Sequence, residues 1–218
     1  ALDILGEISL SGDPKAKEKL QAIKDITDKG MEGSVTFRES LELRLDILKA
    51  NKAQISDLID ALKKKVSKSF ERNKEFLQEN ADDIFIISNG FKDFIIPIVA
   101  DYGIKKENVF ANEFVYDESG KIVDFNRDNP LSKNNGKAET IKKINLEGDI
   151  YVIGDGYTDY EIKASGLANK FYAFTENVHR PKVASQADHV APSLDEILYI
   201  SKLNTKFSYP KSRIKVLL

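Results

Sequence analysis

The sequence of 218 residues has no cysteine, one methionine and only two histidines. The absence of cysteine excludes disulfides, thiolate metal ligands and a cysteine nucleophile. Because His179 and His189 are the only histidines and no Gly-x-Ser-x-Gly segment occurs, no serine hydrolase triad is indicated. We expect both histidines to be structural or surface residues.

A strong charge of one sign is missing as well. Lys and Arg number 33 against 35 Asp and Glu, which gives a formal net charge of -2. This balance provides no electrostatic reason to expect nucleic acid as a partner.

Long apolar runs are also absent. Stretches such as residues 94–100 are too short to cross a bilayer, and no basic segment followed by an apolar one stands at the N-terminus. We therefore expect a soluble protein without a membrane partner, in the cytoplasm by default.

The first feature that the sequence does contain is a helical region. Over residues 13–80, apolar side chains recur at spacings of three and four, as in Leu41, Leu45 and Leu48. This periodicity predicts a helical bundle. The length of the chain suits one domain with a large insertion of this kind.

Strands and helices are expected to alternate from about residue 82 onward. Residues 84–87 are β-branched and aromatic, and Ser88-Asn89-Gly90 is expected to end that strand in a tight turn. A hairpin is expected over residues 110–125. The other predicted strands are 150–153 and 171–174, and the predicted helices are 91–102, 137–144, 159–165 and 179–186.

Strands separated by helices predict an α/β fold, a Rossmann-like parallel sheet with helices on both faces, here with a helical cap insertion. We expect the start of the core and the cap linker at residues 1–12, the cap at 13–80 and the α/β core at 81–203. Residues 204–218 are expected to form a linker that enters a further domain.

Residues 154–159, Gly-Asp-Gly-Tyr-Thr-Asp, follow the strand predicted at 150–153. A dinucleotide fingerprint would need a third glycine in place of Asp159, and Asp155 would repel a pyrophosphate. A calcium loop would need a ligand where Tyr157 stands. Two carboxylates at this place suit Mg²⁺, which binds one or two carboxylates together with phosphate oxygens and water. The alternative is a glycine-rich turn in which Asp159 caps the next helix.

Two more polar groups are expected at the carboxyl ends of the strands, where open parallel sheets bind ligands. Ser88-Asn89-Gly90 offers a hydroxyl and backbone N–H groups to an anion. Lys137 opens a helix, where its charge opposes the helix dipole unless an anion lies nearby. Taken singly, Ser88 also fits a helix cap and Lys137 a solvent-exposed lysine.

In this order, Ser88-Asn89-Gly90, Lys137 and residues 154–159 resemble motifs two, three and four of the haloacid-dehalogenase-like superfamily. Residues 31–49, Met-Glu-Gly-Ser-Val-Thr-Phe-Arg-Glu-Ser-Leu-Glu-Leu-Arg-Leu-Asp-Ile-Leu-Lys, are similar to the cap of the phosphoserine phosphatases. The resemblance extends from Ala1 to about Leu203. It implies a Mg²⁺-dependent phosphomonoester hydrolase that acts on O-phosphoserine in serine biosynthesis.

The resemblance also implies roles for residues of the cap. Arg44 would pair with the carboxylate of O-phosphoserine, a role that suits the planar fork of a guanidinium. Met31 and Phe37 would line the pocket, although both also fit an ordinary apolar core of the cap.

In the core, the resemblance implies that Ser88 and a backbone N–H of Asn89 or Gly90 bind the phosphoryl group and that Lys137 neutralises it. Asp155 would ligate Mg²⁺, while Asp159 would support the metal shell or position Lys137. Two departures from the family pattern concern substrate contacts. Asn89 stands where glycine is frequent and Thr158 where asparagine is frequent, so phosphate contacts at these positions are expected to differ.

Residues 1–6, Ala-Leu-Asp-Ile-Leu-Gly, resemble the stretch just after motif one. The nucleophilic aspartate of the implied aspartyl-phosphate mechanism, and the central strand that carries it, are therefore expected upstream of Ala1. Without them the chain is expected to be inactive, with exposed strand edges.

The C-terminal segment 209–218 resembles the start of a phosphoglycerate dehydrogenase domain, which predicts a fused serine-biosynthesis protein. Two alternatives remain for the function. One is a phosphatase of the same superfamily for another small metabolite, and the other is a non-catalytic phosphate-binding module of the fused protein.

Overall fold

The computed structural model describes residues 1–32, 34–205 and 215–217, and these residues form two compact units. The first unit comprises residues 1–65, 89–98 and 111–136. The second comprises residues 66–88, 99–110 and those from 137 onward. Within the described part of the chain, every helix is too short or too polar to cross a membrane.

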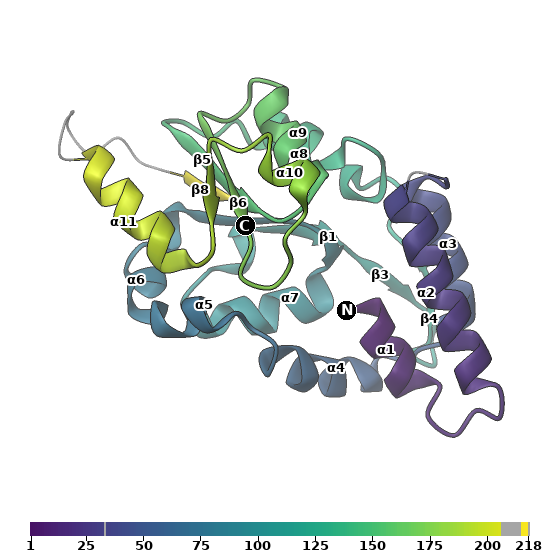
Figure 1. The fold of residues 1–218 in the computed structure, drawn as a ribbon. Helices are drawn as coiled ribbons and strands as arrows, with labels where there is room; N and C mark the ends of the chain where they lie inside the picture. The colour runs from purple at the N-terminus through teal and green to yellow at the C-terminus, as the bar shows by residue number, and fades with distance from the viewer. Residues whose placement is uncertain (33, 206–214, 218) are drawn as a thin grey trace. The chain divides into compact units, whose positions relative to one another are not determined.

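The first unit is mainly helical, and its two longest helices pack side by side (Figure 1). Its elements are α1 (Leu2–Ser9), α2 (Ala16–Glu32), α3 (Phe37–Leu48), α4 (Ala53–Lys63), α7 (Lys92–Val99), the 3-10 helix η4 (Pro130–Ser132) and the antiparallel hairpin β3 (Phe114–Tyr116) and β4 (Ile122–Phe125). The helices predicted over residues 13–80 are therefore present. Helix α1 lies where only a linker was expected.

Local sequence explains where α3 begins and ends. The hydroxyl of Thr36 accepts a hydrogen bond from the Glu39 N–H at 3.2 Å, and the Glu39 carboxylate accepts one from the Thr36 N–H at 2.9 Å. This reciprocal pair is a capping box, which satisfies two donors at the start of the helix. The helix ends at Leu48, and the φ of 45° at the C-cap residue Lys49 takes the backbone into the left-handed region.

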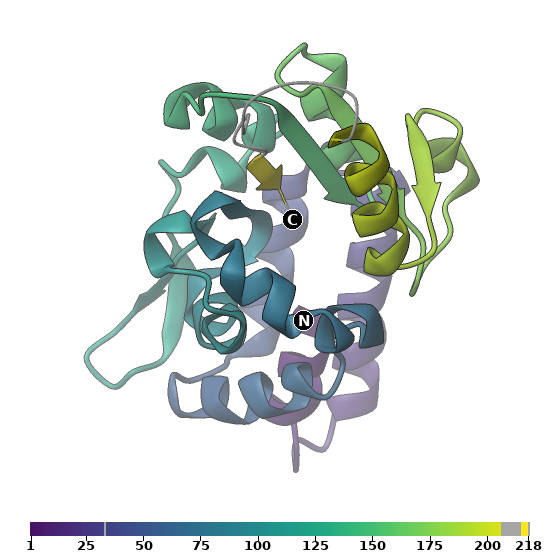
Figure 2. The same ribbon diagram turned by 90° about the vertical axis from the view of Figure 1, so that its left-hand side faces the viewer.

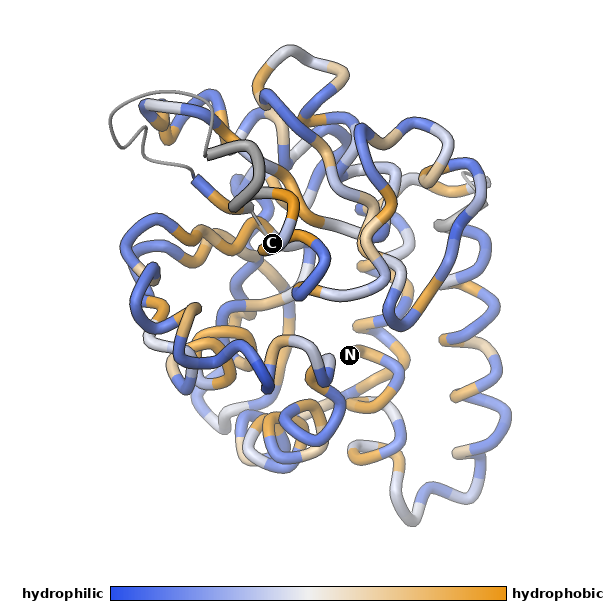
Figure 3. The backbone as a smooth tube through the Cα atoms, turned by 60° about the vertical axis from the view of Figure 1, so that its left-hand side comes forward, coloured by the Kyte–Doolittle hydropathy of each residue, from blue (hydrophilic) through white to orange (hydrophobic). Residues whose placement is uncertain are grey.

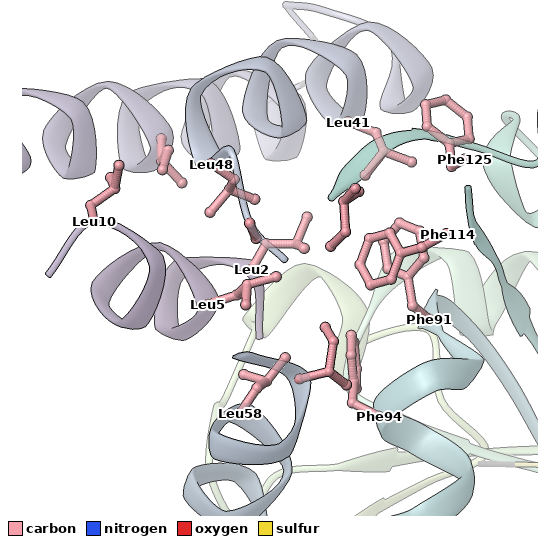
Figure 4. Close-up of a cluster of buried hydrophobic side chains, with 14 residues drawn as sticks. Leu2, Leu5, Leu10, Leu41, Leu48, Leu58, Phe91, Phe94, Phe114 and Phe125 are labelled. Atoms are coloured by element: carbon pink, nitrogen blue, oxygen red, sulfur yellow. The ribbon is translucent and has the colours of Figure 1, made fainter. Parts of the chain in front are cut away.

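A cluster of apolar side chains forms the core of the first unit (Figure 4). In Figure 3, hydrophobic and hydrophilic segments alternate along α2 and α3, as expected for helices with one buried face. The rings of Phe91 and Phe114 stack with centroids 3.6 Å apart. Leu41 and Leu48 of α3 are fully buried in the same cluster, which fixes α3 within this unit.

The second unit contains most of a six-stranded sheet with the strand order β2-β1-β8-β5-β6-β7. The strands are β1 (Ile84–Phe91), β2 (Val109–Asn112), β5 (Ile150–Gly154), β6 (Lys170–Phe174), β7 (His189–Ala191) and β8 (Lys215–Leu217). Strand β8 pairs in parallel with β1 and β5, β5 pairs in parallel with β6, and β6 with β7. The prediction of an α/β fold with a parallel sheet is confirmed.

The remaining helices belong wholly or almost wholly to the second unit. They are α5 (Lys68–Arg72), α6 (Lys74–Glu79), α8 (Gly136–Ile144), α9 (Tyr157–Ala164), α10 (Pro181–Ala184), α11 (Leu194–Thr205) and the 3-10 helices η1 (Ala81–Asp83), η2 (Ala100–Tyr102) and η3 (Lys106–Asn108). Helices α8 and α9 start within one residue or two of the predicted positions. Helix α10 is much shorter than the predicted helix over residues 179–186.

Two local predictions were wrong. Ser88-Asn89-Gly90 is not a turn, because strand β1 continues through these residues to Phe91. The first arm of the predicted hairpin is divided, since residues 109–112 form β2 in the large sheet and only residues 114–116 form the hairpin strand β3.

Strand β8 lies in the centre of the sheet, although it comes after all the other strands in the sequence (Figures 1 and 2). Its Lys215 is mostly buried, with a side chain only 10% exposed, and the ammonium lies 2.5 Å from the carboxylate of Asp83. The Lys215 N–H also donates to the Asp149 carbonyl at 2.9 Å. Residues 215–217, which were expected to belong to a linker, thus form a strand of this sheet. Residues 206–214 and 218 of the predicted linker lie outside the described residues.

Candidate functional site

The candidate site of the second unit centres on a buried ion pair between Lys137 and Asp159. Lys137 lies in the first turn of α8, and its ammonium is 2.5 Å from Oδ1 of Asp159 in the first turn of α9. The two side chains are only 13% and 9% exposed. The second oxygen of Asp159 accepts a hydrogen bond from the Gly156 N–H at 3.0 Å. Asp159 therefore both caps the start of α9 and orients Lys137.

Glycine is required at position 154 for this arrangement. A Cβ atom on Gly154 would lie 2.2 Å from Cγ of Asp159, far inside van der Waals contact. Because Gly154 has no side chain, the Asp159 carboxylate can lie against the end of β5 and accept the hydrogen bond from Gly156. The Gly-Asp-Gly spacing in the sequence reflects this packing.

Asp155 offers the more accessible carboxylate of the same loop. Its side chain is 50% exposed, and it forms an ion pair with Arg180. Nη1 of Arg180 donates to the Asp155 carbonyl at 3.0 Å and also to the carboxylate oxygen Oδ2. Because Asp159 is already committed to Lys137 and Gly156, Asp155 is the carboxylate that a metal ion could use.

The donors at this loop fit Mg²⁺ better than a metal that needs a complete protein shell. The described residues contain no group of three or more His, Cys, Asp or Glu side chains arranged for a metal. Mg²⁺ is commonly held by one or two carboxylates, with water and substrate phosphate oxygens completing its octahedral shell. A loop with a single accessible carboxylate agrees with that pattern.

Ser88 and Asp155 lie at the same level of the sheet. Leu217 of β8 is the register partner of Phe85 on one side and of Val152 on the other. Ser88 and Asp155 each lie three residues beyond these partners, in parallel strands that run in the same direction. Their positions are therefore level with each other on the two sides of β8, toward the side of the sheet where the carboxyl ends of parallel strands bind ligands.

In the first unit, Asn89 and Gly90 continue strand β1 beyond Ser88. The Asn89 side chain donates to the Leu131 carbonyl at 2.8 Å, and the buried Asn112 donates to the Asn89 carbonyl at 2.9 Å. A carbonyl and the N–H of the next residue point in opposite directions across a trans peptide. Asn112 therefore fixes the direction of the Gly90 N–H. Sequence reasoning missed Asn112, which lies inside the arm of the predicted hairpin and whose contact with Asn89 has no local signal in the sequence.

Arg44, the residue predicted to contact the substrate carboxylate, belongs to the first unit. Arg44 is half-buried in α3, and its Nε donates to the Ser40 carbonyl at 3.0 Å. Burial lowers the pKa of its guanidinium, while the nearby Asp3 acts in the opposite direction.

The other predicted substrate contacts have different surroundings. Phe37 packs against the apolar core of the first unit. Met31 lies in α2, but its side chain is outside the described part of the chain. Thr158 lies in the first turn of α9, in the second unit, and is exposed.

With this geometry in place, comparison with known proteins identifies the family. The family model described as haloacid dehalogenase-like hydrolase matches residues 5–162. The chain belongs to this family. The resemblance seen in the motifs is confirmed, and with it the hydrolase fold.

The relatives of this haloacid dehalogenase-like chain include several phosphoserine phosphatases. The chloroplastic enzyme of Arabidopsis thaliana is 33% identical over 172 residues, which is 77% of this chain and 58% of the relative. The enzyme of Drosophila melanogaster is 33% identical over 177 residues, or 79% of this chain and 65% of the relative. The chain thus spans less than two thirds of either relative.

A solved structure resembles the chain over nearly its whole length. It is a phosphoserine phosphohydrolase-like protein from Francisella tularensis, with a TM-score of 0.75 and 30% identity. The match covers 91% of each chain.

Proposed function

We propose that this protein is part of a Mg²⁺-dependent phosphomonoester hydrolase whose substrate is O-phosphoserine. The observation that carries the proposal is the edge formed by Ser88, the Lys137–Asp159 pair and the accessible Asp155. The similarity to phosphoserine phosphatases supports the choice of substrate. Serine biosynthesis in the cytoplasm is the setting that this proposal implies.

In this proposal the side chains of the edge act on the phosphoryl group. Lys137 places a positive charge against it, and Asp159 holds that ammonium in position through a short ion pair. The Ser88 hydroxyl would donate a hydrogen bond, and a backbone N–H of Asn89 or Gly90 would donate another. Asp155 would hold Mg²⁺, which when bound supplies further positive charge to the phosphate oxygens. Phosphoryl transfer depends mainly on such positioning and charge neutralisation.

Recognition of the serine part is assigned to the cap. Arg44 would grip the carboxylate of O-phosphoserine, and Phe37 and Met31 would line the pocket. The nucleophilic aspartate is assigned to a segment upstream of Ala1, as in the family motif that precedes the cap. A second aspartate of that motif would act as general acid and base.

The test is hydrolysis of phosphate esters by a version of the chain extended upstream of Ala1. We expect O-phosphoserine to have the highest kcat/KM among O-phosphoserine, O-phosphothreonine and glycerol phosphate. Higher kcat/KM for another ester would indicate a different metabolite phosphatase. Binding of phosphate without turnover of any ester would indicate a non-catalytic module.

The role of Lys137 is tested in the same extended protein. We expect Lys137→Met to lower kcat/KM by about 10²–10³, since losing one group that stabilises transition-state charge costs roughly that factor. Lys142→Met, an exposed lysine on the same helix, is the matched control and should change kcat/KM less than about twofold. Equal effects of the two substitutions would contradict the assignment.

A further inference from the structure

Arg180 is a basic residue of this loop region to which the proposed reaction gives no role. It directly precedes the four-residue helix α10, and its backbone carbonyl accepts hydrogen bonds from the Val183 and Ala184 N–H groups at 3.0 and 2.9 Å. Its guanidinium reaches 25 positions back along the chain to bind both the carbonyl and the carboxylate of Asp155. The backbone of Arg180 is thus anchored, and only its side chain has to move to release Asp155.

The two ion pairs of the 154–159 loop differ in accessibility. Lys137 and Asp159 are 13% and 9% exposed, whereas Arg180 and Asp155 are 33% and 50% exposed. Breaking a buried pair leaves an uncompensated charge and is costly, while an exposed pair has little net stability and exchanges readily with solvent and ions. Only the Asp155 pair is therefore suited to open during ligand binding.

A guanidinium and a divalent cation would compete for the same carboxylate. Mg²⁺ needs direct contact with a carboxylate oxygen in a regular octahedral shell, and the Oδ2 atom of Asp155 already accepts a hydrogen bond from Arg180. The positive charge of the Arg180 guanidinium, which contacts Asp155, also repels an incoming cation.

We propose that Arg180 is a resident counter-cation of Asp155 that a divalent cation must displace, so that Arg180 sets the metal affinity of the site. This inference rests on the proposed function only in assuming that Asp155 binds the metal. Arg180 is a positioning residue in this role, since it acts through Asp155. It keeps the carboxylate neutralised and directed when no metal is bound.

The test is direct binding of Mn²⁺ alone, measured by electron paramagnetic resonance without substrate or phosphate. We expect Arg180→Gln to bind Mn²⁺ about fivefold more tightly than the unsubstituted chain, the factor that corresponds to an exposed ion pair. Arg180→Lys, which keeps the charge, should remain near the unsubstituted affinity. Lys182→Gln removes a charge from the exposed lysine two residues along the chain and should change affinity less than twofold.

The outcomes separate this inference from the proposed function. Unchanged or weaker Mn²⁺ binding in Arg180→Gln, with binding still lost in Asp155→Asn, overturns the role of Arg180 alone. Equal Mn²⁺ binding in Asp155→Asn and the unsubstituted chain overturns the metal assignment on which the proposed function depends. Tighter binding in Arg180→Gln that disappears when Asp155→Asn is added supports both.

Discussion

Asp159 is the side chain on which the order of the site depends most. Its two oxygens bind the Lys137 ammonium and the Gly156 N–H, so one carboxylate ties α8 to the start of α9. Both partners are within the second unit. Because the pair is buried, removing either charge leaves the other without compensation.

Gly154→Ala tests whether the loop depends on the space beside Asp159. The added Cβ would lie 2.2 Å from Cγ of Asp159, so the carboxylate or the strand must shift. We expect a loss of about 1–3 kcal/mol in the free energy of unfolding, the range for overpacked sites, measured by urea denaturation. In Gly156→Ala, the matched control, the nearest atom to the Cβ would be an Asp159 oxygen at 3.3 Å, so the loss should be smaller. An unchanged free energy of unfolding in Gly154→Ala would show that the loop tolerates the displacement.

Sequence reasoning singled out residues that stand next to the ends of predicted strands and helices. Lys137, Asp155 and Asp159 each follow or begin a predicted element, and their types suit phosphate and metal chemistry without knowledge of the fold. It missed Arg180 and Asn112 because their partners lie 25 and 23 residues away and are brought near only by the sheet. Tertiary contacts of this kind leave no periodic signal in a single sequence.

Among the elements, strand β1 shows why a turn prediction failed. Ser, Asn and Gly favour turns because they can satisfy the backbone locally. Here the Asn89 side chain donates to the Leu131 carbonyl, and the Asn89 carbonyl accepts from Asn112, so these polar groups are satisfied while the backbone stays extended. The partners lie outside the segment, and propensity alone could not reveal them.

Strand β8 is the element least expected from the sequence. The central strand was expected upstream of Ala1, and its absence was expected to leave strand edges exposed. In the structure residues 215–217 form the strand between β1 and β5, so the facing edges of these two strands are paired. Pairing on both sides gives this short strand more ladder contacts than an edge strand of equal length. Lys215 adds its ion pair with Asp83.

Val216→Asp tests whether β8 occupies the centre of the sheet in solution. Val216 is the partner of Ile84 and Tyr151, so a carboxylate there would stand between two paired strands. We expect a loss of roughly 1–3 kcal/mol in unfolding free energy, the cost of a poorly compensated polar group. Val190→Asp, on the exposed edge strand β7, should cost no more than about 0.5 kcal/mol. Equally small losses of unfolding free energy in Val216→Asp and Val190→Asp would contradict the central position of β8.

The whole chain is nearly neutral, so binding of the proposed phosphate ester has to depend on a few placed groups and not on a general field. The structure collects these groups in the second unit: Ser88 and Asp155 at one level of the sheet, and Lys137 held by Asp159. The first unit holds Arg44 and Phe37 in a helical cap-like region.

A crystal structure of the protein with Mn²⁺ and inorganic phosphate tests the central claim most directly. We expect an anomalous peak for Mn²⁺ bonded to Asp155, with the Arg180 side chain displaced, and a phosphate within hydrogen-bond distance of the Lys137 ammonium and the Ser88 hydroxyl. Mn²⁺ bound away from Asp155, or phosphate bound away from Lys137 at saturating concentration, would contradict the account.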